Sequence, residues 1–367
     1  MNALIPLVVH DAFLFPGGGE RVALELARSF KAELWTGHCR PKVFPDGYFS
    51  SVHMRNLNAL GKASLWLGFS EIARYAWAFS RMPGRKAAWT IFSGSLSLLA
   101  YRRISGPKLL YCHTPPRLLY DLNDYYLRRV HPVLRPGLRM VAFFYRRAYE
   151  RALDEMDGII ANSANVKKRL KQYVHKDSEV IYPPCDTQGF AWLGQQDYYL
   201  STARLDAVKR VDVVVNAFLK MPHRKLIVVS GGSEFNRIRA LAGNTPHIQV
   251  LGWVEDALLK KLVGNCIATI YIPRDEDFGI SPVESMSAGK PVIGVAEGGL
   301  LETVVSGETG ILMNSKPIEE DVIAAVDFLT PSTADQMHSA CVSQAANFSR
   351  MVFIEKIRKA VSRYQAI

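Results

Sequence analysis

The second half of the chain alternates short apolar runs with glycine turns, and this alternation limits the possible folds more than any other feature. Runs of strand length lie at 226–229, 248–251, 268–272 and 291–295, and glycines closely follow three of them. A segment of helical character comes after each run. Strands that alternate with helices form a parallel sheet with helices on both faces. We therefore expect a doubly wound α/β domain in this half.

The third of these runs leads into an acidic loop and a helix start. Residues 267–272 have the length and β-branched content of a buried strand, and P-R-D-E-D-F-G-I-S-P-V-E follows them. Ser281 can cap free N–H groups, and the fixed φ of Pro282 suits the first position of a helix. We expect this helix to run from about Pro282 to Ala288.

A strand, an acidic loop and a helix start in this order suit a nucleotide sugar. The unpaired N–H groups and partial positive charge of a helix N-terminus favour a phosphate, and the loop adds backbone amides at Phe278, Gly279 and Ile280. Glu276 on the loop can hold sugar hydroxyls, and Glu284 in the first helical turn can hold two vicinal ones. The two carboxylates alone would also fit a plain acidic turn.

Glu276 and Glu284, with Phe278-Gly279 between them, resemble the E-x7-E signature of the retaining glycosyltransferases of family 4. The resemblance implies the GT-B fold, in which two Rossmann-like doubly wound parallel-sheet domains face each other across a cleft. It also implies transfer of a sugar from a nucleotide donor with retention of configuration. In that family the first Glu lies by the donor sugar and the second by the ribose.

Other segments are similar to the same family. Arg204 and Lys209 follow a strand expected at 198–203, and the resemblance implies that they clamp the donor diphosphate. A first strand, Ile5 to His10, precedes the turn G-G-G-E, whose equivalent in the family faces that diphosphate. Backbone groups at Trp253 and Val254 would read the base. The donor-binding residues expected besides the two cations are Gly18, Gly19, Trp253, Val254, Phe278, Gly279, Ile280, Ser281 and Glu284.

A histidine follows another predicted strand, Lys108 to Cys112. The prolines of H-T-P-P-R exclude a helix and hold His113 at the carboxyl end of this strand, where open α/β sheets place ligands. A structural role is the alternative for a single histidine. The motif resembles the active-site histidine of mannosyltransferases that assemble lipid-linked polysaccharide and O-antigen, which favours GDP-mannose as donor. We expect Arg117, Tyr120 and Asp121 on the acceptor side, and a UDP-sugar transferase or a GT-B sugar-nucleotide epimerase as alternatives.

The length of 367 residues suits two domains. The stiff stretch Pro183-Pro184-Cys185-Asp186 resembles the hinge between them. We expect an acceptor-binding domain at 1–184 and a nucleotide-sugar-binding domain at 185–347. The basic segment 348–367 is expected to form a terminal helix that, in this fold, crosses back to the first domain.

The net charge of +11 belongs to the first half, since residues 1–183 contain 27 Lys and Arg against 14 Asp and Glu. Such an excess indicates an anionic partner. A basic amphipathic segment from Tyr125 to Met156 carries seven arginines, and we expect it to meet the anionic inner face of a membrane that holds a lipid-linked glycan acceptor. A solvated helix face is the alternative. Aromatics among cations in residues 53–106 allow a membrane surface or a buried helix: Trp66, Phe69, Tyr75, Trp77, Phe79 and Trp89.

Other classes of protein fit less well. The sequence has no apolar run long enough to span a membrane, its start does not resemble a signal peptide, and its five cysteines lack zinc-site spacing, so we expect a cytoplasmic, peripherally membrane-associated protein. A nucleic-acid-binding protein would not explain the Glu pair, and no recognition motif for nucleic acid is present. Asp275-Glu276-Asp277 has the D-x-D pattern of a metal site, but Arg204, Lys209 and helix N-termini already neutralise a diphosphate. We expect no metal and no other cofactor.

Overall fold

The computed structural model describes residues 4–60 and 68–365, and these form two compact units. Unit 1 contains the chain up to Pro184 together with the segment from Phe353 on, and unit 2 is Cys185–Val352. The prolines at 183 and 184 therefore lie at the boundary. The sequence assigned 348–352 to the terminal segment, whereas these residues belong to unit 2.

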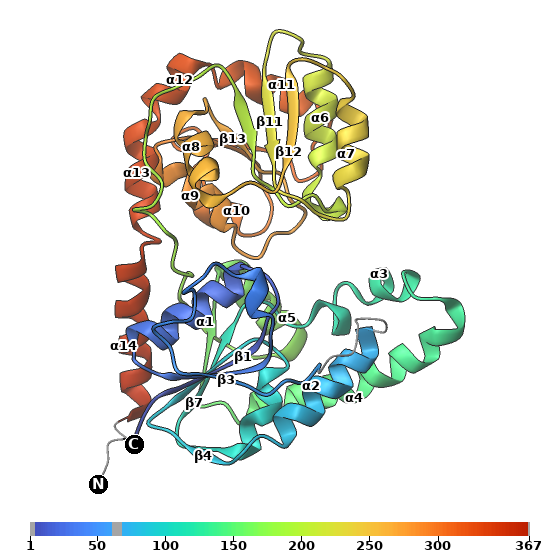
Figure 1. Cartoon of the computed structure of the whole chain (residues 1–367), viewed down its shortest axis with the longest axis vertical. Coiled ribbons are helices and arrows are strands. Elements are labelled where there is room, and N and C mark those ends of the chain that lie inside the picture. Colours follow the sequence, from blue (N-terminus) through green and yellow to red (C-terminus); the bar gives the residue numbers. More distant parts are fainter. Residues whose placement is uncertain (1–3, 61–67, 366–367) are drawn as a thin grey trace. The chain divides into compact units, whose positions relative to one another are not determined.

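Unit 1, in which Figure 1 labels strands β1, β3 and β7, is built on a parallel sheet of seven strands in the order β3-β2-β1-β5-β7-β8-β9. The strands are β1 Leu7–Phe13, β2 Glu33–Cys39, β3 Met54–Asn56, β5 Thr90–Ser93, β7 Lys108–Cys112, β8 Gly158–Ala161 and β9 Glu179–Val180. A small pair, β4 Arg85–Lys86 and β6 Ile104–Ser105, lies apart from it. The helices are α1 Gly18–Ser29, α2 Gly68–Ser80, α3 Asn123–Arg128, α4 Arg135–Asp154, α5 Ala164–Val174 and most of α14 Arg350–Gln365.

Two apolar clusters form the core of unit 1. One joins α2 and α4 to the sheet through residues such as Phe79, Phe92 and Tyr149. The other joins α1 and α14 to the sheet, with Phe353 and Ile357 of α14 fully or nearly fully buried. The terminal helix is thus an integral part of the core of unit 1.

Unit 2 is built on a parallel sheet of six strands in the order β12-β11-β10-β13-β14-β15. The strands are β10 Tyr199–Ser201, β11 Leu226–Val229, β12 Ile248–Gly252, β13 Thr269–Ile270, β14 Val292–Val295 and β15 Gly310–Met313. Its helices are α6 Val211–Leu219, α7 Phe235–Ala242, α8 Asp256–Asn265, α9 Ile280–Ser287, α10 Leu300–Thr303, α11 Glu319–Phe328, α12 Pro331–Gln336 and α13 His338–Ala346. The expectation of doubly wound parallel sheets is confirmed.

The strand order places one switch point in each sheet. In unit 1 the chain moves outward from β1 through β2 to β3 and then returns to the other side of β1 at β5. In unit 2 it moves from β10 to β12 and returns beside β10 at β13. Loops that leave the carboxyl ends of strands at such a point diverge and leave room for a ligand. Both candidate sites described below lie there.

Two predicted boundaries, the end of the first strand and the start of α9, are wrong. The first strand begins at Leu7 and continues to Phe13, so His10 and Asp11 lie inside it and not at its end. Helix α9 begins at Ile280, and Gly279 with a φ of +91° occupies its N-cap. Ser281 is therefore a helical residue and no cap, and Glu284 lies in the second turn and not the first. Glycine takes the cap because a positive φ strains other residues.

The basic segment 125–156 is not one helix. Helix α3 ends at Arg128, and the 3-10 turn Pro132–Leu134 comes before α4. Pro132 cannot continue a helix from its interior, which accounts for the break between the two helices. Tyr75, Phe79 and Trp89 are core residues, whereas Trp77 is 62% exposed. For Tyr75, Phe79 and Trp89 the alternative of a buried position is therefore correct. Trp66 and the side chain of Phe69 lie outside the described residues.

All five cysteines are buried thiols. Within the described ranges, no helix is both long and apolar enough to cross a membrane.

Candidate functional site

Two loops of unit 2 bring Lys209 and Glu276 together at the switch point. Lys209 ends the 3-10 turn Ala207–Lys209 after β10, and Glu276 lies on the loop after β13. The Lys209 ammonium donates to the Glu276 carboxylate in a short ion pair and to the Tyr271 hydroxyl at 3.1 Å. Tyr271 in turn donates to Glu276 at 3.1 Å. Both charged side chains are 19% exposed, so the pair is shielded and still open to a ligand.

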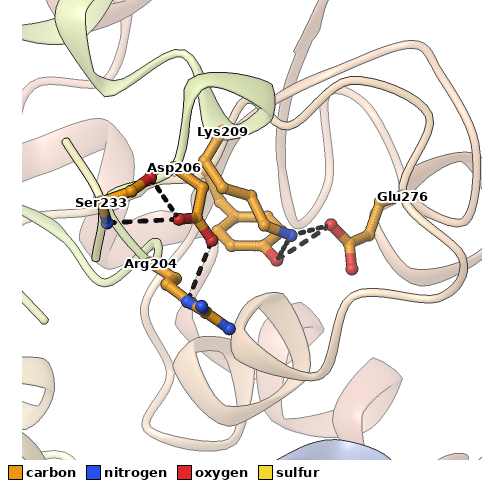
Figure 2. Close-up of polar contacts among 6 residues, drawn as sticks. Arg204, Asp206, Lys209, Ser233 and Glu276 are labelled. Atoms are coloured by element: carbon orange, nitrogen blue, oxygen red, sulfur yellow. Dashed lines mark hydrogen bonds and ion pairs between the residues drawn. The ribbon is translucent and has the colours of Figure 1, made fainter. Parts of the chain in front are cut away.

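Arg204 lies on the same loop as Lys209 but is more exposed. Its Nε is 2.9 Å from an oxygen of Asp206, and 51% of the Arg204 side chain is accessible. The other oxygen of Asp206 accepts a hydrogen bond of 3.0 Å from the hydroxyl of Ser233, which follows β11 (Figure 2). Asp206 therefore ties the loop after β10 to the loop after β11 and orients Arg204.

The electrostatics of this group keep Lys209 positive. Burial alone would lower the pKa of Lys209, but Tyr271 and Glu276 together raise it well above its ordinary value. Burial also raises the pKa of Tyr271, so its hydroxyl is neutral at physiological pH. The Glu276 carboxylate balances the charge of Lys209, and Asp206 balances that of Arg204. An anionic group placed beside Arg204 and Lys209 would compete with these two carboxylates for the cations.

The loop that carries Glu276 is held against α10 by backbone contact. The amide of Gly299 donates to the carbonyl of Glu276 at 2.8 Å. Gly298 has a φ of +60°, and a Cβ there would lie 2.4 Å from that carbonyl oxygen. Only glycine permits this approach, so the glycine pair fixes the backbone beneath Glu276.

In unit 1 three strands bring two histidines and a serine together. His10 on β1 and Ser93 at the end of β5 are partners in the strand register, and His113 follows β7. The Nδ1 of His10 lies 2.7 Å from the carbonyl oxygen of Ser93 and 3.2 Å from its hydroxyl. The same hydroxyl is 2.8 Å from Nε2 of His113. Burial, with a smaller effect of His10, lowers the pKa of His113 to about 3, so its ring is neutral.

The glycine turn lies beside these histidines. A Cβ at Gly19 would come within 3.5 Å of His113 Nε2, an ordinary contact distance. Gly18 is the first residue of α1. Asp11, next to His10, accepts backbone hydrogen bonds from Ser95, Leu96 and Ser97. The carboxylate thus fixes the loop after β5 next to the glycine turn.

A second carboxyl group lies under the glycine turn. Glu20 in the first turn of α1 is only 9% exposed. Burial, aided by the nearby Asp11, raises its pKa from 4.5 to about 7 against the opposing effect of backbone hydrogen bonds. Glu20 therefore changes charge near neutral pH.

Comparison with known proteins fits this arrangement. The family model described as Glycosyltransferase Family 4 matches residues 16–188, and the model described as Glycosyl transferases group 1 matches 187–346. The two models together span most of both units. This chain belongs to glycosyltransferase family 4.

Relatives and solved structures agree with the family. The glycosyltransferase is 23% identical to the alpha-1,3/1,6-mannosyltransferase ALG2 of Mus musculus, over 96% of this chain and 95% of the relative. It is 25% identical to that of Candida glabrata, over 90% and 83%. Sucrose-phosphate synthase of Thermosynechococcus elongatus matches with a TM-score of 0.78 at 18% identity over 99% of both chains. HepE of Anabaena, solved with UDP and glucose, matches with a TM-score of 0.70 at 16% identity over 98% of this chain and 100% of that one. The structural matches confirm the predicted GT-B fold.

The remaining donor residues predicted for this glycosyltransferase lie at the same sheet edge of unit 2. Trp253 follows β12, is 75% exposed and approaches Gly231 so closely that a Cβ there would lie 2.2 Å from the indole nitrogen. Val254 is partly buried against an apolar cluster. Phe278 is buried and packs on Phe348 with ring centroids 5.4 Å apart, so its side chain belongs to the core. Their donor roles, like those of Ile280 and Glu284 on α9, stay predictions.

The three residues predicted on the acceptor side have partners within unit 1. Arg117 pairs with Asp121, with a distance of 2.9 Å between Nε and the carboxylate. Tyr120 stacks on Tyr173 with centroids 5.2 Å apart and donates to Glu150 at 3.3 Å. These contacts explain the order of the loop after His113, and the acceptor role stays a prediction.

Among the described residues, no three His, Cys, Asp or Glu side chains gather as metal ligands would. Glu276, the centre of the D-x-D pattern, is engaged with Lys209.

Sequence reasoning about this glycosyltransferase missed several participants. Asp206 lies between Arg204 and Lys209 in the predicted clamp but was given no role there, and Tyr271 and Ser93 belong to segments without a motif. Only strand register brings Ser93 to His113. A signal was present for His10 and Asp11, because two polar residues interrupt the apolar sequence of β1.

Proposed function

We propose that this glycosyltransferase moves mannose from GDP-mannose to a hydroxyl of a lipid-linked oligosaccharide, in the assembly of a cell-surface polysaccharide. The observation that carries the donor half of the proposal is the grouping of Arg204, Lys209 and Glu276 at the switch point of unit 2. The choice of mannose is supported by the names of the relatives, which are alpha-1,3/1,6-mannosyltransferases. The H-T-P-P-R motif at His113 supports it independently.

In the proposed reaction the bond between the anomeric carbon and the diphosphate breaks, a bond to the acceptor oxygen forms on the same face, and the proton of the acceptor hydroxyl passes to the departing diphosphate oxygen. Negative charge develops on the leaving diphosphate, where Arg204 and Lys209 stabilise it. Glu276 lies by the donor sugar, and Glu284 holds the ribose hydroxyls. The two cations perform the neutralisation that a divalent metal performs in other transferases, so we propose that activity needs no metal and persists in a chelator.

We also propose that unit 1 meets an anionic membrane surface. Apolar side chains of the turn and helix after α3 are exposed: 77% of Val133, 59% of Met140, 51% of Phe143 and 64% of Phe144. Arginines accompany them, and the guanidinium carbon of Arg147 is 4.4 Å from the centre of the Phe143 ring. Exposed rings that intercalate at headgroup level beside cations that meet lipid phosphate are typical of interfacial helices. A lipid-linked acceptor would be reached at such a surface, at the cytoplasmic face of the membrane.

A thermal-shift screen with GDP-, UDP-, ADP- and dTDP-sugars tests the donor assignment. We expect GDP-mannose to raise the melting temperature most and Glu284→Ala to abolish that rise while the unliganded variant melts like the wild type. A larger shift with a UDP-sugar would show that the donor is that sugar nucleotide and not GDP-mannose. An unchanged GDP-mannose response in Glu284→Ala would remove Glu284 from the donor site.

A further inference from the structure

The contacts between His10, Ser93 and His113 determine where hydrogens can lie. The carbonyl oxygen of Ser93 only accepts, and it is 2.7 Å from Nδ1 of His10. That nitrogen must therefore carry a hydrogen. Burial lowers the pKa of His10 despite the opposing attraction of Asp11 and the backbone hydrogen bonds, which keeps the other ring nitrogen unprotonated.

The Ser93 hydroxyl forms the next hydrogen bonds in this series. It is 3.2 Å from the same Nδ1–H of His10, which makes it an acceptor on that side. Its own hydrogen then has one direction left, toward Nε2 of His113 at 2.8 Å. If His113 donated instead, the hydroxyl hydrogen of Ser93 would have no acceptor among the described residues, although this side chain is fully buried. A buried donor without an acceptor is unfavourable, so the first arrangement is preferred.

We propose that Ser93, itself oriented by His10, is a positioning residue that holds His113 as the neutral tautomer with its hydrogen on Nδ1. The proposal deepens the assignment of His113 to the active site and rests on it. With Nε2 occupied by the serine, His113 acts through Nδ1 as a hydrogen-bond donor. It is excluded from acting as a base through Nε2. At Gly19, which lies on the side of Nε2, even an added Cβ would come no closer than 3.5 Å to that nitrogen, so the glycine turn leaves the bond between Ser93 and His113 undisturbed.

Nuclear magnetic resonance of the full chain labelled with 15N-histidine tests the tautomer directly. Long-range correlations distinguish a protonated from an unprotonated ring nitrogen, and His113→Gln assigns the signals. We expect Nδ1 of His113 to be protonated and Nε2 unprotonated, without change between about pH 6 and 8. A protonated Nε2 in the wild type would overturn the proposal before any variant is made.

Variants of Ser93 distinguish a role in positioning His113 from a role in packing alone. Ser93→Ala should shift His113 toward the tautomer protonated on Nε2 and lower kcat roughly tenfold, the effect of about 1.4 kcal/mol, with a smaller change in KM. Ser93→Thr, which keeps the hydroxyl, should restore both. Ser97→Ala is the matched control, because the Ser97 hydroxyl is also fully buried but has no hydrogen-bond partner in the described chain. An unchanged tautomer in Ser93→Ala contradicts the proposal.

The spectra also separate this proposal from the proposed function. If the predicted tautomer is found but His113→Gln retains full transfer activity, the positioning by Ser93 stands and the catalytic assignment of His113 fails. If transfer depends on His113 but its tautomer is the opposite one, the transferase site stands and the role of Ser93 fails.

Discussion

Lys209 lies at the centre of the polar group after β10 and β13 in unit 2. Its ion pair with Glu276 joins residues 67 positions apart, and the Tyr271 hydroxyl contacts both partners. The pair is partly shielded from water, so each charge interacts more strongly than it would on an open surface. A diphosphate that arrives here would meet a cation already oriented by a carboxylate, and little reorganisation would be needed.

We expect Arg204→Ala and Lys209→Ala each to lower kcat by more than about tenfold, since one charge-assisted contact is worth roughly 1.5–3 kcal/mol. Steady-state kinetics with saturating donor measures this. Lys220→Ala is the matched control, because Lys220 forms ion pairs with Glu319 and Glu320 in the same unit but is 50% exposed. Wild-type kcat in both cation variants would remove the diphosphate assignment.

Glu20 gives unit 1 a pH-dependent stability. Its pKa rises from 4.5 in the unfolded chain to about 7 in the fold, so between these values the folded protein binds more protons than the unfolded one. Its contribution to stability is therefore lost as pH rises through this range. Glu20→Gln cannot ionise, and we expect it to gain roughly 1–3 kcal/mol relative to the wild type between about pH 5 and pH 8. Denaturant unfolding at both values measures the difference; an equal effect at the two would show that Glu20 does not titrate there.

The sequence predicts a site residue when the signal for it lies in neighbouring residues. Arg204, Lys209, Glu276 and Glu284 stand in short motifs next to recognisable strands, and the first three do gather at one sheet edge. Ser93 and Tyr271 stand in no motif, since their importance comes from the register between strands distant in sequence.

The helices and strands show the same difference between features set by local sequence and features set by tertiary packing. Strands such as Lys108–Cys112 and Leu226–Val229 were predicted with their exact bounds, because they are apolar runs bounded by turn residues. The start of α9 was predicted two residues late, because the prediction placed the cap at Ser281. The actual cap is Gly279, which adopts a positive φ. The burial of Tyr75 and Trp89 depends on which helix covers which sheet face, and this is decided by packing.

Helix α4 and its neighbours should determine membrane binding. Replacing Arg128, Arg129, Arg146 and Arg147 by Gln removes four charges, each worth about 1 kcal/mol near an anionic surface. We expect the quadruple variant to sediment poorly with anionic vesicles and to lose activity on a lipid-linked acceptor, while it binds donor normally. Binding of the wild type should fall with added salt, because the Debye length shortens.

The control for this variant removes four charges elsewhere in unit 1. Lys167, Lys168, Lys171 and Lys176 lie on or just after α5, and their replacement by Gln changes the net charge equally. This variant should still bind vesicles. If both variants behave alike, the attraction depends on net charge and α4 has no special part in it.

At the scale of the whole molecule, the chain closes unit 1 with its last helix. Phe353 on α14 is 2% exposed in the core that contains α1 and the sheet. We expect Phe353→Ala to destabilise unit 1 by roughly 3–5 kcal/mol, the usual cost of a cavity of this size. Thermal unfolding should show an earlier transition for unit 1, whereas the stabilisation of unit 2 by donor should persist. Exposed Met351→Ala, 74% accessible and just before Phe353, is the control.

The function proposed for this glycosyltransferase is transfer of a sugar from a nucleotide donor to a lipid-linked acceptor. The most direct measurement incubates the full chain with GDP-mannose and follows nucleotide release with and without a lipid-diphosphate-linked oligosaccharide. We predict rapid release of GDP only when the acceptor is present, with mannose recovered on it in the α configuration of the donor. Rapid release without an acceptor, conversion of the donor to another nucleotide sugar, or a product of inverted configuration would show that the protein is not a retaining transferase acting on this acceptor.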